Sequence, residues 1–523
     1  MTRLLLLLCA ALAPAVCQER ITIHVDTSKK LGPMKQVWGF FGYDEPNYTY
    51  TADGKKLIGE LAALAPQPVY IRTHFLLASG DAQSALKWGS TNAYTEDASG
   101  KPIYDWTVID RIFDTYLQAG AKPFVEIGFM PEALSTHPEP YRHEWPKSNF
   151  TGWSYPPNDY NKWSELIYHL TRHCVEKYGT QEAQTWYWEV WNEPDIAYWH
   201  GTPEEYDKLY DSTVKAVKRA LPAARVGGPA TTGPGSQRST GFLRQFLEHC
   251  DKTGAPLDFI SFHAKGQPHV VDGHVRMGLT QELNNVQNGV EIVRSFQKFA
   301  SLPIILSEAD PEGCAACSQE HYPQNAYRNG SLYPAYDAAA LDGILKIAAR
   351  SRANVAGMLT WAFEFEAQPY FAGFRELATN GIDKPILNLF RMLGQMTGDR
   401  IESTDSLVVA NDHTISVLVW NFQADDVAGP AQPVSIAVTQ QKTSPQRVLM
   451  RQFRIDDEHS NAYTAWRRMG SPQKPTAEQY EELERAGQLQ LFESPKWISA
   501  QHGSLETSFD LPRNAVSLVQ FSW

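Results

Sequence analysis

Short apolar runs alternate with longer amphipathic stretches between about residue 35 and residue 395 of this chain. Each run is rich in aromatic and β-branched residues, as buried strands are, and helix-like sequence follows it. Eight such units are what a (β/α)8 TIM barrel requires, so the sequence predicts an α/β fold whose barrel spans residues 35–395. An open doubly wound sheet is the alternative, but no glycine-rich dinucleotide loop follows the first run.

The elements of this region can be placed individually. The eight predicted strands are Val37–Tyr43, Pro68–Phe75, Pro123–Phe129, Thr185–Trp191, Arg225–Pro229, Asp258–His263, Pro303–Ser307 and Val355–Phe363. The helix-like segments include Asp110–Gly120, Tyr160–Tyr178, Pro203–Ala220, Asn285–Ala300 and Ala335–Ala349. Because the active site of a barrel forms at the carboxyl ends of its strands, residues that end these runs are the candidates for chemistry.

A second kind of sequence begins at about residue 400. Alternating or β-branched segments are separated there by turn residues, which predicts a smaller antiparallel β-sandwich over residues 400–523. The early segment Ile21–Val25 is expected to join it, and a polar helical stretch, Thr476–Gln488, interrupts it. The predicted strands are Leu407–Ala410, Thr414–Trp420, Val434–Val438 and Ala515–Phe521.

The first 17 residues have the pattern of a secretory signal peptide. Arg3 precedes a run of leucines, and small residues lead up to Cys17, in a segment too short to span a bilayer. With no other candidate span in the sequence, we expect a soluble protein that is secreted or periplasmic. The net charge of −12 comes with no dense Lys/Arg tract, so neither nucleic acid nor a membrane is expected as a partner. The sequence does not indicate the oligomeric state.

Four cysteines follow the signal segment. In an oxidising compartment Cys314 and Cys317 could close a small disulfide loop, with free buried thiols as the alternative. A zinc site is disfavoured, because Cys174 and Cys250 have no ligand-like spacing. Three sequons would carry glycans only in an organism that glycosylates proteins: Asn47, Asn149 and Asn329.

A carboxylic acid stands at the predicted end of the fourth strand, within Trp191-Asn192-Glu193-Pro194-Asp195. Pro194 cannot continue a central strand, which places Glu193 at the active-site end of the barrel. The seventh run ends in Ser307-Glu308-Ala309, which brings Glu308 to the same end. A lone glutamate at a strand end is more often part of a surface ion pair. Two carboxylates about 5 Å apart, however, are what a retaining glycosidase uses.

These motifs resemble the clan A glycoside hydrolases and, within that clan, family 39, which holds β-xylosidases and α-L-iduronidases. Asn-Glu-Pro alone marks only the clan, whereas the combination of motifs is specific. Further similar segments are Arg72-Thr73-His74, Asp258–His263, Phe371–Phe374 and Gly381–Pro385. The resemblance covers nearly the whole mature chain and implies a retaining hydrolase that needs neither a metal nor another cofactor.

The resemblance and the chemistry together imply roles for individual residues. Glu193 is expected to act as proton donor and then as base, and Glu308 as nucleophile. Arg72 is expected to keep Glu308 ionised. Substrate contacts are expected from Asn192, His74, His263, Lys265 and Trp361. Alternatives remain open for four of them: a structural role for either histidine, a salt bridge for Lys265, and core packing for Trp361.

The expected substrate is a carbohydrate, but the motifs do not decide which sugar is cleaved. β-D-xylosidase activity is preferred, because exported xylosidases are the commoner enzymes and Phe371–Phe374 looks xylosidase-like. The segments around Lys265 and Glu308 instead resemble iduronidases, and Lys265 with Arg375 could pair with a uronic carboxylate. Arabinosidase and galactosidase activities are further alternatives. A catalytically inactive carbohydrate-binding barrel is disfavoured by the presence of both glutamates, and a polysaccharide-binding sandwich by the lack of a recognisable aromatic cluster.

Overall fold

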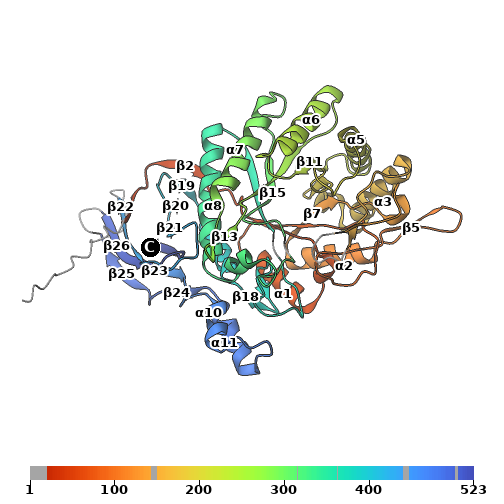
Figure 1. Ribbon diagram of the computed structural model, residues 1–523. Helices are drawn as coiled ribbons and strands as arrows, with labels where there is room; N and C mark the ends of the chain where they lie inside the picture. The colour runs from red at the N-terminus through yellow and green to blue at the C-terminus, as the bar shows by residue number, and fades with distance from the viewer. Residues whose placement is uncertain (1–19, 143–149, 315, 362, 440–446, 501–503) are drawn as a thin grey trace, which may run out of the picture.

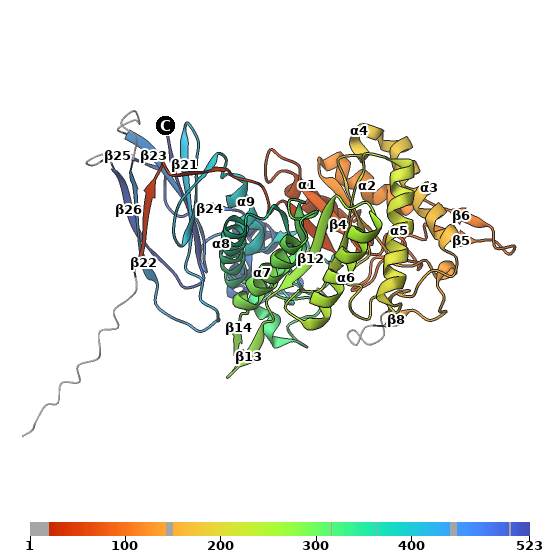
Figure 2. The same cartoon turned by 90° about the horizontal axis from the view of Figure 1, so that it is seen from above.

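The computed structural model describes residues 20–142, 150–314, 316–361, 363–439, 447–500 and 504–523. The predicted signal peptide, residues 1–17, and the sequon at Asn149 lie outside these residues. Figures 1 and 2 show a barrel next to a β-sandwich, with α8 and α9 between them. Within the described residues, every helix is too short or too polar to cross a membrane.

The eight predicted strands are all present, and they close into a parallel barrel in the order β10-β11-β12-β15-β16-β3-β4-β7. The predicted TIM barrel is therefore confirmed, and the open-sheet alternative is wrong. Aromatic rings fill part of its interior, with Phe40 stacked on Tyr70 at 5.0 Å and Phe124 beside Tyr187 at 5.4 Å. The strands are β3 (Phe40–Tyr43), β4 (Tyr70–Thr73), β7 (Lys122–Ile127), β10 (Tyr187–Val190), β11 (Arg225–Thr231), β12 (Phe259–Lys265), β15 (Ile304–Asp310) and β16 (Val355–Trp361).

Helices surround this barrel, each with a buried apolar face. Local signals fix their ends: Thr202 and Glu205 form a capping box at the start of α5, and Asp159 caps α3. The predicted bounds of α3 and α5 are matched, whereas α7 lies several residues earlier than expected because Phe296 turns extended and ends it. The helices are α1 (Ala52–Ala62), α2 (Thr107–Ala119), α3 (Tyr160–Tyr178), α4 (Thr180–Ala183), α5 (Pro203–Ala220), α6 (Gln237–Thr253), α7 (Leu279–Ser295), α8 (Leu332–Ser351) and α9 (Pro385–Gly394).

The loops that follow the barrel strands contain short strands and 3-10 helices. These loops lie at the end of the barrel where the predicted site residues lie. They form paired hairpin strands and single turns of 3-10 helix, so this end of the barrel is built up far more than the other. The hairpins are β5 (Tyr94–Glu96) with β6 (Pro102–Tyr104), β8 (Tyr141–Arg142) with β9 (Phe150–Gly152), β13 (His269–Val271) with β14 (His274–Arg276), and β17 (Ala378–Thr379) with β18 (Ile382–Asp383). The 3-10 turns are η1 (Pro46–Tyr48), η2 (Glu132–Leu134) and η3 (Pro323–Asn329).

Two sheets form the sandwich and enclose a separate aliphatic core, to which Ile23, Val417 and Ile436 belong. The predicted sandwich is confirmed, but it is not wholly antiparallel, because β1 pairs with β22 in parallel. No hairpin joins these two strands, so nothing local forces them to run in opposite directions. One sheet holds β1 (Ile21–Asp26), β22 (Gln432–Thr439) and β26 (Ser504–Leu511); the other holds β2 (Lys30–Pro33), β19 (Asp399–Ile401), β20 (Ser406–Ala410), β21 (Thr414–Trp420), β27 (Val516–Ser522), β23 (Arg447–Ile455), β24 (Gln490–Leu491) and β25 (Lys496–Ser499).

A helical insertion separates β23 from β24 and consists of α10 (Ala462–Arg468), α11 (Ala477–Gly487) and the turn between them. The polar helical stretch predicted at Thr476–Gln488 is α11, which Thr476 caps. The insertion does not pack on the sandwich alone. Its Trp466 and Leu483 form an apolar cluster with Phe371 and Ile382 of the barrel, so the insertion reaches the loop that follows β16.

The cysteines and two of the sequons have defined environments. Cys314 and Cys317 form a disulfide, one of the two states that the sequence left open, while Cys174 and Cys250 are free and buried. Asn47 and Asn329 are fully buried, and their amides donate hydrogen bonds to the carbonyl oxygens of Ser90 and Phe371, both at 2.9 Å. These two asparagines are structural and are not presented at the surface.

Candidate active site

Glu193 lies just beyond the end of β10, in a strained turn. The backbone φ angles of Trp191 and Glu193 are +71° and +45°, values that non-glycine residues seldom adopt. The turn is held by a hydrogen bond from the Glu193 amide to the Ala230 carbonyl (2.9 Å) and by one from the Trp191 indole to the Tyr198 carbonyl (2.9 Å). The Glu193 side chain is 16% exposed, so a substrate can reach it.

Glu308 lies on β15 with its carboxylate facing that of Glu193. One carboxylate oxygen of each residue and a ring nitrogen of His263 all lie within 4.8 Å of one another. The shared contact is His263, whose Nδ1 is 2.8 Å from Glu193 Oε1 and 3.7 Å from Glu308 Oε1. The two glutamates predicted from strands four and seven are thus brought together.

Positive groups surround Glu308. Lys265 Nζ lies 2.7 Å from its Oε2, Arg72 Nη1 lies 3.5 Å from its Oε1, and Arg375 Nη2 lies 3.8 Å from its Oε2. Burial by itself would raise the pKa of Glu308, but His263, Lys265, Arg375 and Arg72 outweigh it and hold that pKa well below its usual range. Glu308 is therefore an anion at neutral pH.

Arg72 organises the base of the site rather than serving Glu308 alone. Its guanidinium donates to Glu189 Oε2 at 2.6 Å, to Asn192 Oδ1 at 3.0 Å and to His74 Nε2 at 2.8 Å. Because the Asn192 oxygen is engaged in this way, its amide NH2 group is the part left to donate to a substrate hydroxyl.

His74 was predicted to contact the sugar, but in the structure both of its ring nitrogens contact protein groups. Its Nε2 accepts from Arg72, and its Nδ1 lies 2.8 Å from Asp44 Oδ1, so both ring nitrogens have protein partners. Burial lowers the pKa of His74, which agrees with a neutral ring that accepts at one nitrogen and donates at the other. These contacts are those expected of a structural histidine, one of the two alternatives open from the sequence.

His263, Lys265 and Trp361 line the same site. Among the described residues, nothing hydrogen-bonds to the buried Nε2 of His263, whose other nitrogen contacts Glu193. Lys265 Nζ bridges Glu308 and Asp310, at 2.7 Å from each, so the salt-bridge interpretation of Lys265 describes its observed contacts. Trp361 is 1% exposed and its ring lies 4.4 Å from that of His74, which favours packing beneath the site.

Sequence reasoning missed several charged residues at this end of the barrel. Asp44 directly follows the first strand and pairs with both His74 and Lys87. Its position at a strand end was a usable signal, the same one that identified Glu193. Lys87 lies in a long loop without any motif. Glu126 is the second-last residue of β7 but lies in the middle of the run predicted from the sequence, and burial raises its pKa to about 8. Neither had a signal in the sequence.

A metal ion fits this arrangement poorly. Glu193, His263 and Glu308 are close enough for one atom of each to reach a common ion. Lys265, Arg72 and Arg375 already balance the charge of Glu308, however, and a cation placed there would meet their repulsion.

The geometry is that of a glycosidase site, and the comparisons with known proteins agree. The family model described as "Glycosyl hydrolases family 39" matches residues 21–501. The chain belongs to this family. It is 30% identical over 434 residues to a β-xylosidase of Caldicellulosiruptor saccharolyticus, covering 79% of this chain and 82% of the relative. It is 24% identical over 563 residues to human α-L-iduronidase, covering 95% and 78%.

A solved structure of a monomeric β-xylosidase from Caulobacter crescentus CB15 has the same fold, with a TM-score of 0.79 at 23% identity over 96% of this chain and 99% of that one. The family match and the β-xylosidase relative identify this family 39 protein as a glycoside hydrolase of the β-xylosidase-like type.

The contacts of Glu308 predict the pH dependence of this family 39 enzyme. A carboxylate nucleophile attacks only when it is ionised, so with Glu308 in its predicted role activity is expected to fall when the pH drops through its pKa. In Lys265→Met the nearest positive charge is lost, the pKa of Glu308 rises, and the acidic limb of the kcat/KM profile is expected to move to higher pH. Lys265→Arg keeps the charge and should leave the limb in place. An unmoved limb in Lys265→Met would contradict the role of Lys265.

Proposed function

We propose that this protein is an exported, retaining exo-glycosidase of β-D-xylosidase type. The observation that carries the proposal is the approach of Glu193 to Glu308, whose nearest carboxylate oxygens lie within 4.8 Å. Retaining enzymes hold their carboxyl groups about 5–5.5 Å apart, whereas inverting enzymes need about 6.5–9.5 Å for a water molecule. The signal-peptide pattern of residues 1–17 supports export.

Hydrolysis then proceeds in two displacements. Glu308 attacks the anomeric carbon and forms a glycosyl ester, while Glu193 gives its proton to the departing oxygen. In the second step Glu193 takes a proton from a water molecule, the water oxygen attacks the anomeric carbon, and Glu308 leaves as a carboxylate. Asn192 donates to the sugar during both steps, and its orientation is fixed by Arg72.

The charge balance around Glu308 favours a neutral sugar over a uronic acid. Lys265 and Arg375 are the cations that a uronic carboxylate would need, but both already contact Asp310 as well as Glu308. Two cations thus face two anions, and a third carboxylate would find no uncompensated positive charge. α-L-Iduronidase activity therefore remains the second candidate, supported by the similarity to iduronidases.

A panel of aryl glycosides tests this function. We expect kcat/KM for the β-D-xyloside to exceed the values for the α-L-iduronide, arabinoside, galactoside and glucoside. Nuclear magnetic resonance of the first-formed sugar should show the same anomeric configuration as the substrate. A preference for the iduronide would replace the xylosidase proposal, and an inverted product would refute the double displacement.

A further inference from the structure

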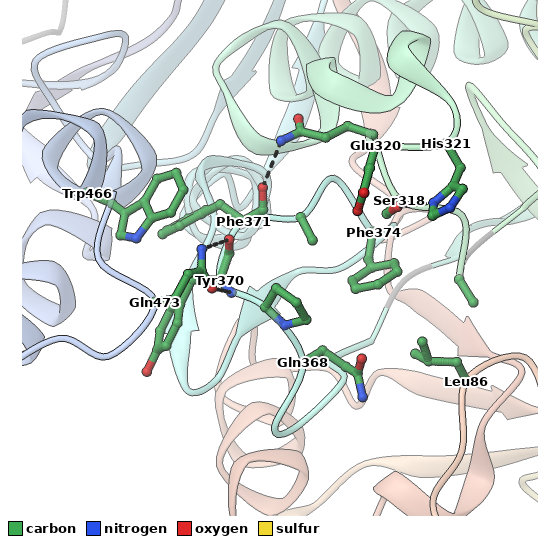
Figure 3. Close-up of a pocket in the computed structure, with 14 residues that line it drawn as sticks. Leu86, Ser318, Glu320, His321, Gln368, Tyr370, Phe371, Phe374, Trp466 and Gln473 are labelled. Atoms are coloured by element: carbon green, nitrogen blue, oxygen red, sulfur yellow. Dashed lines mark hydrogen bonds between the residues drawn. The ribbon is translucent and has the colours of Figure 1, made fainter. Parts of the chain in front are cut away.

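A cavity of about 380 Å³ lies at the same end of the barrel as the catalytic pair, and none of the active-site residues described above lines it. Its walls are the loops after β15 and β16, Leu86 from the loop after β4, and Trp466 and Gln473 from the helical insertion. Figure 3 shows Trp466 and Gln473 on one side of this cavity and Ser318 and His321 on the other. Its volume is in the range of small-ligand sites.

The order of strands sets this cavity across the barrel from Glu193. β16 is four strands away from β10 in both directions around the closed barrel, so the two lie opposite each other. Glu193 follows β10 and must reach the leaving oxygen, so the leaving group lies on that side. The far end of the same sugar ring, with its O3 and O4 hydroxyls, then points toward the strands opposite, where the cavity lies.

Short chain segments connect the cavity to the catalytic site. Leu86 and Phe374 line the cavity, and Arg375, which follows Phe374, has its guanidinium Nη2 3.8 Å from Glu308 Oε2. Consecutive Cα atoms are only 3.8 Å apart. One peptide unit therefore separates the cavity lining from a residue that contacts Glu308.

The loop at 366–374 is held in a strained shape around the cavity. Ala367 and Phe371 have φ angles of +63° and +50°. The Gln473 side chain accepts from the Tyr370 amide at 2.9 Å and donates to the Tyr370 carbonyl at 3.3 Å, while Asn329 donates to the Phe371 carbonyl at 2.9 Å. A strained backbone conformation persists only where many surrounding contacts hold it in place. Such residues are common at functional sites.

The lining suits an uncharged sugar. Tyr370 and Trp466 supply aromatic surface, and Ser318 and Gln368 supply neutral polar groups. None of the described lining residues is a lysine or an arginine, and Glu320 adds a carboxylate, so an acidic or sulfated sugar would be repelled. Flat aromatic faces with hydroxyl and amide partners match a neutral pyranose.

We propose that this cavity is a second sugar site, which receives a neutral pyranose linked to the far end of the sugar that Glu308 attacks. The proposal rests on the proposed function and extends it. The enzyme then removes an intact disaccharide from the end of a chain as well as a single sugar.

Product analysis with two substrates tests the second site. Nitrophenyl β-D-xyloside reports hydrolysis of one sugar, and nitrophenyl β-D-xylobioside can release either intact xylobiose or free xylose. We expect wild type to release xylobiose together with nitrophenol from the start of the reaction. Ala372→Trp, which fills the cavity, and Tyr370→Ala, which removes an aromatic wall, should each lower the ratio of xylobiose to xylose at least tenfold. The exposed Trp497 of the sandwich provides the control Trp497→Ala, which should not change this ratio.

Three outcomes decide between the proposals. A wild type that hydrolyses the xyloside but converts the xylobioside only to xylose and nitrophenyl xyloside overturns the second site and leaves the proposed function standing. A ratio that none of the cavity variants changes overturns it as well. A wild type that hydrolyses neither xyloside overturns the proposed function and, with it, the second site.

Discussion

Glu308→Ala is expected to lower kcat/KM on aryl xylosides by about 10⁴-fold or more, because the proposed double displacement needs this carboxylate to form the covalent intermediate. Lys265, Arg72 and Arg375 are held around the Glu308 carboxylate and no alternative anion replaces it. Steady-state rates over a range of enzyme concentrations measure the loss. Glu291→Ala is the matched control. Glu291 is an exposed glutamate on the outer helix α7, so its replacement should not change kcat/KM.

Azide gives this prediction a second readout. In Glu308→Ala, a small anion can enter the space left by the carboxylate, because the cations that surrounded Glu308 remain there. It can then attack the anomeric carbon from that face. Activity should partly return with azide, and the product should be a glycosyl azide of inverted configuration. Rescue with a product of retained configuration would assign the nucleophile to another residue.

Glu193→Ala is expected to produce losses that depend on the leaving group. General acid catalysis is worth about 10²–10⁴-fold where the departing oxygen needs a proton, so alkyl xylosides and xylobiose should lose activity on that scale. Dinitrophenyl xyloside has an acidic leaving group that departs unaided, and its first step should change little. Pre-steady-state release of dinitrophenol separates this first step from the second, which also needs Glu193 as base.

The comparison between substrates decides the role of Glu193. Equal losses on good and poor leaving groups would contradict its role as proton donor. Because Glu193→Ala vacates the face from which the leaving group departs, added azide should here give a glycosyl azide of retained configuration, the opposite of the Glu308→Ala product.

The fold and the catalytic pair were predictable because their signals are local. The barrel strands are buried on both sides and therefore form continuous apolar runs, and helix ends such as Thr202 at the start of α5 carry their own caps. Pro194 ends the fourth run directly after Glu193, so the position of one catalytic residue follows from chain geometry alone. Counting runs was then enough to pair it with Glu308.

The rest of the site depends on contacts between distant segments. Lys87 and Asp44 are neighbours only because the loop after β4 folds back over the end of β3. The sequence shows His74 beside Arg72 but not that Arg72 and Asp44 occupy both of its nitrogens. The helical insertion was visible as a helix, yet only tertiary packing brings Trp466 onto Phe371. Such pairings leave no periodic pattern in a single sequence.

The pairing of β1 with β22 has a consequence for how the chain is made. Ile21 and Val434 are partners in the first sheet of the sandwich, so the barrel is inserted within the domain that contains both ends of the described chain. During synthesis β1 emerges early and waits for its partner strand until the whole barrel has been produced. The barrel can thus close while the sandwich is still half made, and a truncation after residue 400 would leave both edges of β1 unpaired and open to aggregation.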